Sequence, residues 1–192
     1  MMLCLKNESN TGWIDTATQH LIDVIIDHAH CEKKAAHTGM VLLSKYPEKT
    51  ELCFAMADLV EEEIGHFRSV MQILERRNEK LTPDKGDEYA RLLFTRLRKD
   101  DQNRLLDHLL IAGIIEARSC ERLQILAKHI DDEELRKFYK NLADSEAGHY
   151  MTFVKLAKLY YEENEVKKRL DELTNYEADI IKKLKNEPTM HG

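Results

Sequence analysis

The sequence is poor in residues that break regular structure and in residues that crosslink chains. Its 192 residues include only 7 glycines and 3 prolines, which is too few for a fold with many tight turns and disfavours a β-rich protein. The 4 cysteines form no Cys-x-x-Cys pair and have no regular spacing. This argues against a zinc knuckle or a disulfide framework, and it favours a reducing, cytosolic setting.

Long apolar runs and a strong charge of one sign are also missing. No stretch reaches the roughly 18 apolar residues of a membrane span, and the first residues turn polar too early for a secretion signal, so we expect a soluble, unprocessed, cytoplasmic protein. With 29 Lys and Arg against 35 Asp and Glu, the net charge is −6. This argues against indiscriminate coating of nucleic acid but not against a local basic patch.

Apolar residues, at 43% of the chain, and charged residues, at 33%, are plentiful. This balance is typical of a folded domain, and the length fits one domain over residues 1–192. Apolar residues at helical spacing predict four long helices. They span Ile14–Ser44, Glu51–Arg77, Asp101–His129 and, after a capping box at Asp131 and Glu134, a stretch to Glu162.

Two further helices and the connections complete the predicted topology. A short helix is expected over Tyr89–Arg98, and a fifth longer helix from Asn164 to Leu184. The connections after the first and third long helices are short, whereas the turn-rich stretch 78–87 separates the two halves. The sequence therefore predicts an all-α, ferritin-like four-helix bundle, in which two antiparallel helix pairs are joined by a crossover, with an additional C-terminal helix.

Each of the four long helices carries a glutamate within its apolar stripe. An ionised carboxylate in a protein core costs several kcal/mol unless a cation or hydrogen-bond donor compensates it. The second and fourth helices add a histidine three residues after the glutamate. The set is Glu32, Glu63-Ile-Gly-His66, Glu116 and Glu146-Ala-Gly-His149, and the separations repeat, with 63 − 32 = 31 and 146 − 116 = 30.

One glutamate from each of two helices, plus a Glu-x-x-His motif from each of the other two, is the ligand set of di-iron and di-manganese carboxylate proteins. Residues i and i+3 share a helix face, so the carboxylate and imidazole can reach one metal. A single Glu-x-x-His is usually a solvated pair, but two in register with two core glutamates are far more specific. We therefore predict that Glu32, Glu63, His66, Glu116, Glu146 and His149 bind two metal ions.

Carboxylate-rich sites suit iron or manganese rather than structural zinc. Open positions on two adjacent irons allow O₂ to bind and be reduced, so oxygen activation is the expected chemistry. Both motifs read Glu-x-Gly-His, although Gly65 and Gly148 each cost a helix interior roughly 1 kcal/mol relative to alanine. The repeated glycine suggests a need for room around the metals or against a facing helix.

Neighbouring polar residues have more ordinary interpretations. His28 and His37 are more typical of surface histidines, or histidines satisfied by a neighbour, than of ligands. Cys31 and Cys120 are more typical of small buried hydrophobes. Metal-bound imidazoles usually donate their other N–H to an acceptor, and three carboxylates are candidates among which the sequence does not choose: Asp58, Glu62 and Asp144.

Four segments together resemble the MiaE family, the tRNA 2-methylthio-N6-isopentenyladenosine (ms2i6A) hydroxylases. They are Asp27-His-Ala-His-Cys-Glu-Lys-Lys-Ala-Ala36, Leu59-Val-Glu-Glu-Glu-Ile-Gly-His-Phe67, Ile115-Glu-Ala-Arg-Ser-Cys-Glu-Arg122 and Ser145-Glu-Ala-Gly-His-Tyr150. The likeness runs from about Asp15 to Tyr161. Its most specific part is Glu-Ala-Arg-Ser-Cys-Glu-Arg, because a generic di-iron site does not need these arginines or this cysteine.

The resemblance implies a monooxygenase that hydroxylates the isopentenyl side chain of ms2i6A beside the tRNA anticodon, with the six ligands named above. It implies two iron ions, O₂ as co-substrate and the anticodon stem-loop of tRNA as partner. Since the sequence has no flavin or nicotinamide motif, we expect a separate reductase or ferredoxin-type electron donor.

A basic cluster around the crossover could hold tRNA phosphates, since backbone contacts position a nucleic acid. It consists of Arg91, Arg96, Arg98, Lys99 and Arg104. Charge runs on helices are, however, more often solvated faces. Tyr89 and Phe94 are the candidates for stacking on an unpaired base.

Two other function classes fit parts of the pattern. A ferritin- or rubrerythrin-type protein that stores iron or scavenges peroxide would use the same ligands, and a non-catalytic tRNA-binding module would use only the basic cluster. Storage predicts large shells with many irons per chain, a peroxidase predicts H₂O₂ turnover without tRNA, and a binding module predicts no stoichiometric metal. The sequence leaves open the oligomeric state, the electron donor and the choice between iron and manganese.

Overall fold

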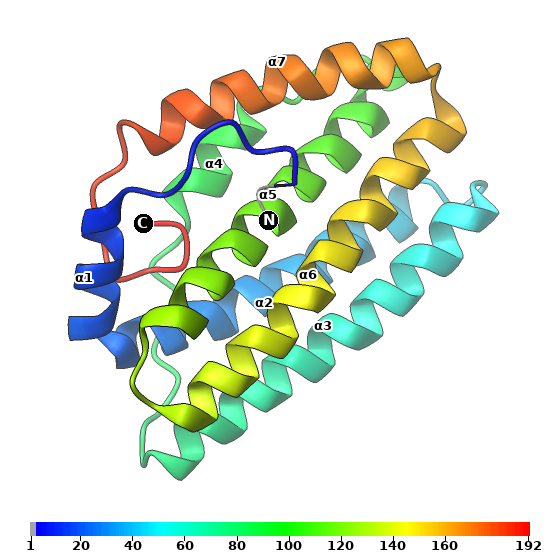
Figure 1. Cartoon of the computed structure of the whole chain (residues 1–192). Coiled ribbons are helices and arrows are strands. Elements are labelled where there is room, and N and C mark those ends of the chain that lie inside the picture. Colours follow the sequence, from blue (N-terminus) through cyan, green and yellow to red (C-terminus); the bar gives the residue numbers. More distant parts are fainter. Residues whose placement is uncertain (1–2) are drawn as a thin grey trace. The chain divides into compact units, whose positions relative to one another are not determined.

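A computed structural model describes residues 3–192, and every regular element in that part of the chain is a helix (Figure 1). The described residues fall into two compact units. One consists of residues 19–86 and 188–190, and the other of residues 3–18, 87–187 and 191–192. The all-helical prediction is confirmed, whereas the expectation of a single domain stays a prediction.

The smaller unit is an antiparallel pair formed by α2 (Leu21–Lys45) and α3 (Thr50–Arg76). Their connection is short and contains Pro47, which disfavours continuation of the first helix. The two helices approach closely at Gly39, where a Cβ atom would lie 2.7 Å from the side chain of Val60. Leu42, Leu52 and Met56 are fully buried, as expected for the apolar stripes of two amphipathic helices.

The larger unit is built on a second antiparallel pair, α5 (Asp101–His129) and α6 (Glu133–Tyr160). At one end of the pair the Tyr161 hydroxyl donates to the Gln102 carbonyl at 2.9 Å, and further along the Cys120 thiol donates to the Ala143 carbonyl at 3.2 Å. α1 (Thr11–Gln19), α4 (Glu88–Phe94) and α7 (Glu163–Ile181) complete this unit.

Aspartate side chains cap three helices of the larger unit. Asp100 accepts from the backbone N–H of Asn103 and so opens α5 at the predicted residue. Asp132, rather than the predicted Asp131, accepts from Leu135 and opens α6. Asp87 caps α4, which is shorter than expected because it ends at Phe94. The last helix begins at Glu163 and ends at Ile181, instead of spanning Asn164 to Leu184.

The predicted first helix, Ile14–Ser44, is in fact two helices. His20 has φ −123° and ψ 44°, outside the helical region, and separates α1 from α2. Tertiary contacts explain the break, because Trp13 is fully buried in the larger unit and the Arg122 guanidinium lies 3.9 Å from the centre of its ring. No proline or glycine lies at the break, so local sequence carries no sign of it.

The sequence predicts neither a membrane-spanning helix nor a disulfide framework. None of the helices from Leu3 onward combines the length and the apolar character that crossing a bilayer requires. No disulfide joins the four cysteines, all of which lie in the described part of the chain.

Candidate metal centre

The helix pair α2 and α3 brings together three of the six predicted ligands. Glu32 and Glu63 are buried, and one ligand atom from each of Glu32, Glu63 and His66 lies within 4.8 Å of the others. His66 Nδ1 is 3.4 Å from Glu32 Oε2 and 3.5 Å from Glu63 Oε2. The i,i+3 spacing of the motif thus places Glu63 and His66 on one face of α3, directed at a glutamate of α2.

One residue that was not predicted as part of the site contacts a predicted ligand in this half of the centre. His28 lies one helical turn before Glu32 on α2, is 2% exposed, and its Nε2 is 2.5 Å from Glu32 Oε1. Its i,i+4 spacing to a core glutamate was the available signal. Asp58, Glu62 and Asp144, the acceptors proposed for the ligating histidines, are exposed, and their role stays a prediction.

The electrostatics of this half-site favour a charged carboxylate beside a protonated imidazole. Burial alone would raise the pKa of Glu32, but the charge and hydrogen bond of His28, together with His66, hold it far below its usual range. Burial alone would lower the pKa of His66, but its hydrogen bonds to Glu32 and Glu63 raise it to about 10. A metal ion that binds at this place would therefore have to displace the His66 proton.

The helix pair α5 and α6 brings the other three predicted ligands together. Glu116, Glu146 and His149 are all buried, with no more than 5% exposed. One ligand atom from each lies within 4.8 Å of the others, and His149 Nδ1 is 3.9 Å from Glu146 Oε1. Each helix pair therefore buries one lone glutamate beside one Glu-x-x-His motif. Buried oxygen and imidazole donors of this kind suit iron or manganese.

The two glycines of the motifs do not serve close packing between helices. A Cβ atom added at Gly65 or Gly148 would meet no other described residue within 4 Å, and Gly148 is exposed. The suggestion that a facing helix requires these glycines is therefore wrong. Room around a metal stays a prediction.

The two arginines of the segment Glu-Ala-Arg-Ser-Cys-Glu-Arg contact other segments of the larger unit. Arg118 is fully buried and donates to Glu177 of α7 at 2.7 Å and to the Asn7 carbonyl at 3.0 Å. Arg122 stacks on Trp13 of α1. These contacts fasten the N-terminal segment and α7 to the ligand-bearing helix α5, which accounts for side chains that a metal site alone does not need.

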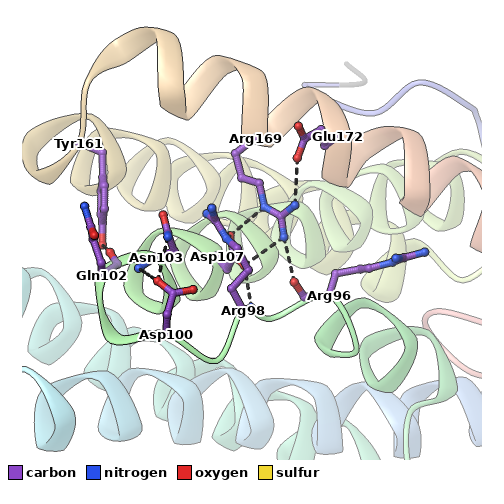
Figure 2. Close-up of polar contacts among 9 residues, drawn as sticks. All are labelled: Arg96, Arg98, Asp100, Gln102, Asn103, Asp107, Tyr161, Arg169 and Glu172. Carbon is purple, nitrogen blue, oxygen red and sulfur yellow. Dashed lines mark hydrogen bonds and ion pairs between the residues drawn. The ribbon is translucent and has the colours of Figure 1, made fainter.

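The basic cluster predicted around the crossover is partly neutralised within the protein (Figure 2). Arg98 and Arg169 both donate to the fully buried carboxylate of Asp107, at 2.7 Å and 2.8 Å. Arg91 forms an exposed pair with Glu88 at 2.6 Å, and the Arg96 guanidinium stacks 3.9 Å from the centre of the Tyr176 ring. At least two of its five cations are thus paired with carboxylates.

Comparisons with known proteins agree with this chemistry. The family described as tRNA-(MS[2]IO[6]A)-hydroxylase (MiaE) matches residues 1–192. A protein of Pseudomonas putida strain KT2440, named tRNA 2-(methylsulfanyl)-N(6)-isopentenyladenosine(37) hydroxylase, is 36% identical over 94% of this chain and 88% of its own. A Salmonella typhimurium LT2 protein of the same name is 28% identical over 88% of this chain and 80% of its own.

A solved structure with a similar fold also matches this chain. This structure, titled "Protein 43 with aldehyde deformylating oxygenase activity from Synechococcus", has a TM-score of 0.94 and 34% sequence identity, and the match covers 98% of this chain and 95% of the other. The similarity confirms the predicted ferritin-like fold class.

Proposed function

This chain belongs to the MiaE family, and from that membership we propose that it hydroxylates the isopentenyl side chain of ms2i6A beside the tRNA anticodon. Both curated relatives described above carry the name of this hydroxylase. The observation that carries the chemical part of the proposal is that each helix pair buries a glutamate next to a Glu-x-x-His motif. A protein that only binds tRNA has no use for these buried charges.

We propose that two iron ions are held by Glu32, Glu63, His66, Glu116, Glu146 and His149. The four carboxylates contribute a charge of −4, which two divalent ions would cancel, and this removes the cost of burying the carboxylates. The donor set, rich in carboxylate and poor in imidazole, fits iron. The bound irons would supply activation of O₂, with one oxygen atom inserted into an allylic C–H bond and the other released as water.

The residues of the chain have defined tasks in this scheme. The four glutamates and His149 are buried, so the packing around them would keep bulk water from the reacting centre. Hydrogen bonds to Glu32 and Glu63 raise the pKa of His66, so the His66 proton would have to leave for this imidazole to hold a metal ion. His28 fixes the carboxylate of Glu32 through Oε1. The two electrons for the reaction come from a separate reductase or ferredoxin-type protein, in the cytoplasm.

The direct test is a single reaction. The iron-loaded protein is reduced, exposed to O₂ and incubated with tRNA that carries ms2i6A, and the nucleosides are analysed by mass spectrometry. We expect the modified adenosine to gain one oxygen atom. Iron accumulation in large shells, or H₂O₂ consumption with unchanged tRNA, would instead support the storage or peroxidase function.

Ligand variants test the residues that carry the proposal. Glu116→Ala and His149→Ala should each lose bound iron and reduce turnover by roughly 100-fold or more, because the loss of an outer-shell partner alone costs up to that factor. Helicity, measured by circular dichroism, should be retained. Glu75→Ala and His37→Ala, at exposed positions, are the matched controls and should keep both iron and turnover. Full activity of either ligand variant without iron would end the mechanism.

A further inference from the structure

The outward side of α6 is a basic stripe in an acidic protein. Lys137, Lys140, Lys155 and Lys158 are all exposed. Lys137 and Lys155 are 18 residues apart, as are Lys140 and Lys158, which is about five helical turns, so each pair lies along one line of the helix. Between Leu135 and Leu159 the only exposed acid is Asp144, because Glu146 is buried. We call these four lysines the α6 basic face.

A glycine, Gly148, lies at the middle of the α6 basic face. Gly148 lies 11 residues after Lys137 and 7 before Lys155, and both spacings are close to whole numbers of turns, so it shares their side of the helix. It is exposed, and a Cβ atom there would meet no other described residue within 4 Å. Packing inside the protein therefore does not explain a glycine that costs helix stability. Glycine does allow an external partner to approach a backbone closely.

The lysines of this face remain available for a polyanion. No hydrogen bond or ion pair joins Lys140 or Lys155 to another described residue. Lys137 pairs with Glu133, and Lys158 with Glu163, but both pairs are solvent-exposed, and such pairs contribute little stability. The crossover cluster differs, because Arg98 is tied to the buried carboxylate of Asp107.

We propose that the α6 basic face, with Gly148 at its centre, binds the sugar-phosphate backbone of the tRNA substrate. The inference rests on the proposed function and names the surface that serves it. Lys158 lies 21 residues after Lys137, a rise of about 32 Å along the helix, which is long enough for several phosphates. The same helix carries Glu146 and His149 on its buried side, so RNA held on this face is held by an element of the metal centre.

Two double variants with the same change in net charge test the surface. Lys140→Gln with Lys155→Gln removes two cations from the α6 basic face, and Lys167→Gln with Lys168→Gln removes two exposed cations from α7. The dissociation constant for tRNA bearing ms2i6A is measured by fluorescence anisotropy at several salt concentrations. Each lost phosphate contact should make the dependence of log affinity on log salt shallower by almost one.

We expect the α6 variant to bind tRNA roughly tenfold more weakly, with a salt slope shallower by nearly two, while its iron content stays at the wild-type value. The α7 variant should bind like the wild type. Equal weakening of both variants would show a general charge effect and overturn the proposed surface, as would wild-type affinity in the α6 variant. If one of these two results overturns the proposed surface but the wild-type protein still hydroxylates tRNA, the proposed function stands. If the wild-type protein neither binds nor hydroxylates tRNA, both proposals fail.

Discussion

At the scale of single residues, His28 and Glu32 show how a predicted ligand is held. Glu32 uses its two carboxylate oxygens differently: Oε1 contacts His28 at 2.5 Å, and Oε2 faces His66 at 3.4 Å. With Oε1 engaged, Oε2 is the oxygen directed toward the other predicted ligands of this half-site. A hydrogen bond from outside the ligand set commonly orients a metal ligand and tunes its basicity.

Replacing His28 tests this arrangement. His28→Leu should weaken iron binding by about 10- to 100-fold, because the carboxylate of Glu32 loses its fixed orientation. The measurement is anaerobic titration with Fe(II), together with the Mössbauer spectrum of the loaded protein, which reports the environment of each iron. His28→Gln keeps a hydrogen-bond donor and should restore part of the affinity.

His37→Leu is the matched control for this substitution, since His37 is exposed on the same helix, and it should bind iron normally. A normal spectrum and normal affinity in His28→Leu would show that His28 only fills space.

At the scale of elements, one buried carboxylate ties three segments of the larger unit together. Asp107 of α5 accepts from Arg169 of α7 and from both the side chain and the backbone N–H of Arg98, which lies in the connection before α5 (Figure 2). Burial alone would raise the pKa of Asp107, but these hydrogen bonds lower it below its ordinary value of 3.8. The ion pairs therefore stabilise the folded state only while Asp107 is ionised.

The sign of the pH dependence follows from the lowered pKa. The stabilisation by Asp107 is complete above the unfolded pKa, near 4, and is lost as the pH falls through the lower folded pKa. Asp107→Asn should reduce the unfolding free energy by about 3 kcal/mol at pH 7, since it removes the charge of the fully buried carboxylate with which two part-buried arginines pair. The difference from the wild type should shrink in urea titrations at pH 3 and below.

Asp171→Asn is the comparison for Asp107→Asn. Asp171 pairs with Lys6 on the surface, so Asp171→Asn should leave the stability close to that of the wild type at either pH. A difference between Asp107→Asn and the wild type that stayed constant with pH would contradict the assignment of the stabilisation to the ionised carboxylate.

At the scale of the whole molecule, the six predicted ligands divide equally between the two compact units. Glu32, Glu63 and His66 belong to the unit of α2 and α3, and Glu116, Glu146 and His149 to the unit of α5 and α6. If both units supply ligands to the same two irons, metal binding must couple them thermodynamically. The proposal that residues 1–192 act as one domain therefore predicts that the two units respond to metal binding together.

Metal loading tests that coupling. Fe(II) at 100 times its dissociation constant should stabilise the folded protein by about 2.7 kcal/mol, which raises Tm by roughly 5 to 10 °C for a chain of this size. Anaerobic calorimetry should show one transition that shifts as a unit, and removal of iron by a chelator should reverse the shift. Glu32→Ala combined with Glu146→Ala should abolish it. Two transitions, only one of which responds to iron, would contradict a centre shared by both units.

Sequence alone determined the long helices, apart from the division of the first one, and which side chains share their apolar faces. The 3.6-residue period places Glu63 with His66, and Glu146 with His149, on one face of each helix, and apolar neighbours indicate that this face is buried. Because these are local properties of a helix, α5 could be predicted to the residue and the ferritin-like class could be recognised. The family resemblance followed from the same stretches of sequence.

Tertiary structure decided which side chains meet, because a helical pattern gives the direction of a side chain but not its partner. It placed His28 against Glu32, divided the first predicted helix at His20 where Trp13 packs under Arg122, and paired the crossover arginine Arg98 with Asp107. It also left Gly148 exposed between lysines that look, in the sequence, like any solvated helix face. Burial and pairing depend on residues far apart in the chain, and the free energies of ion pairs depend on both.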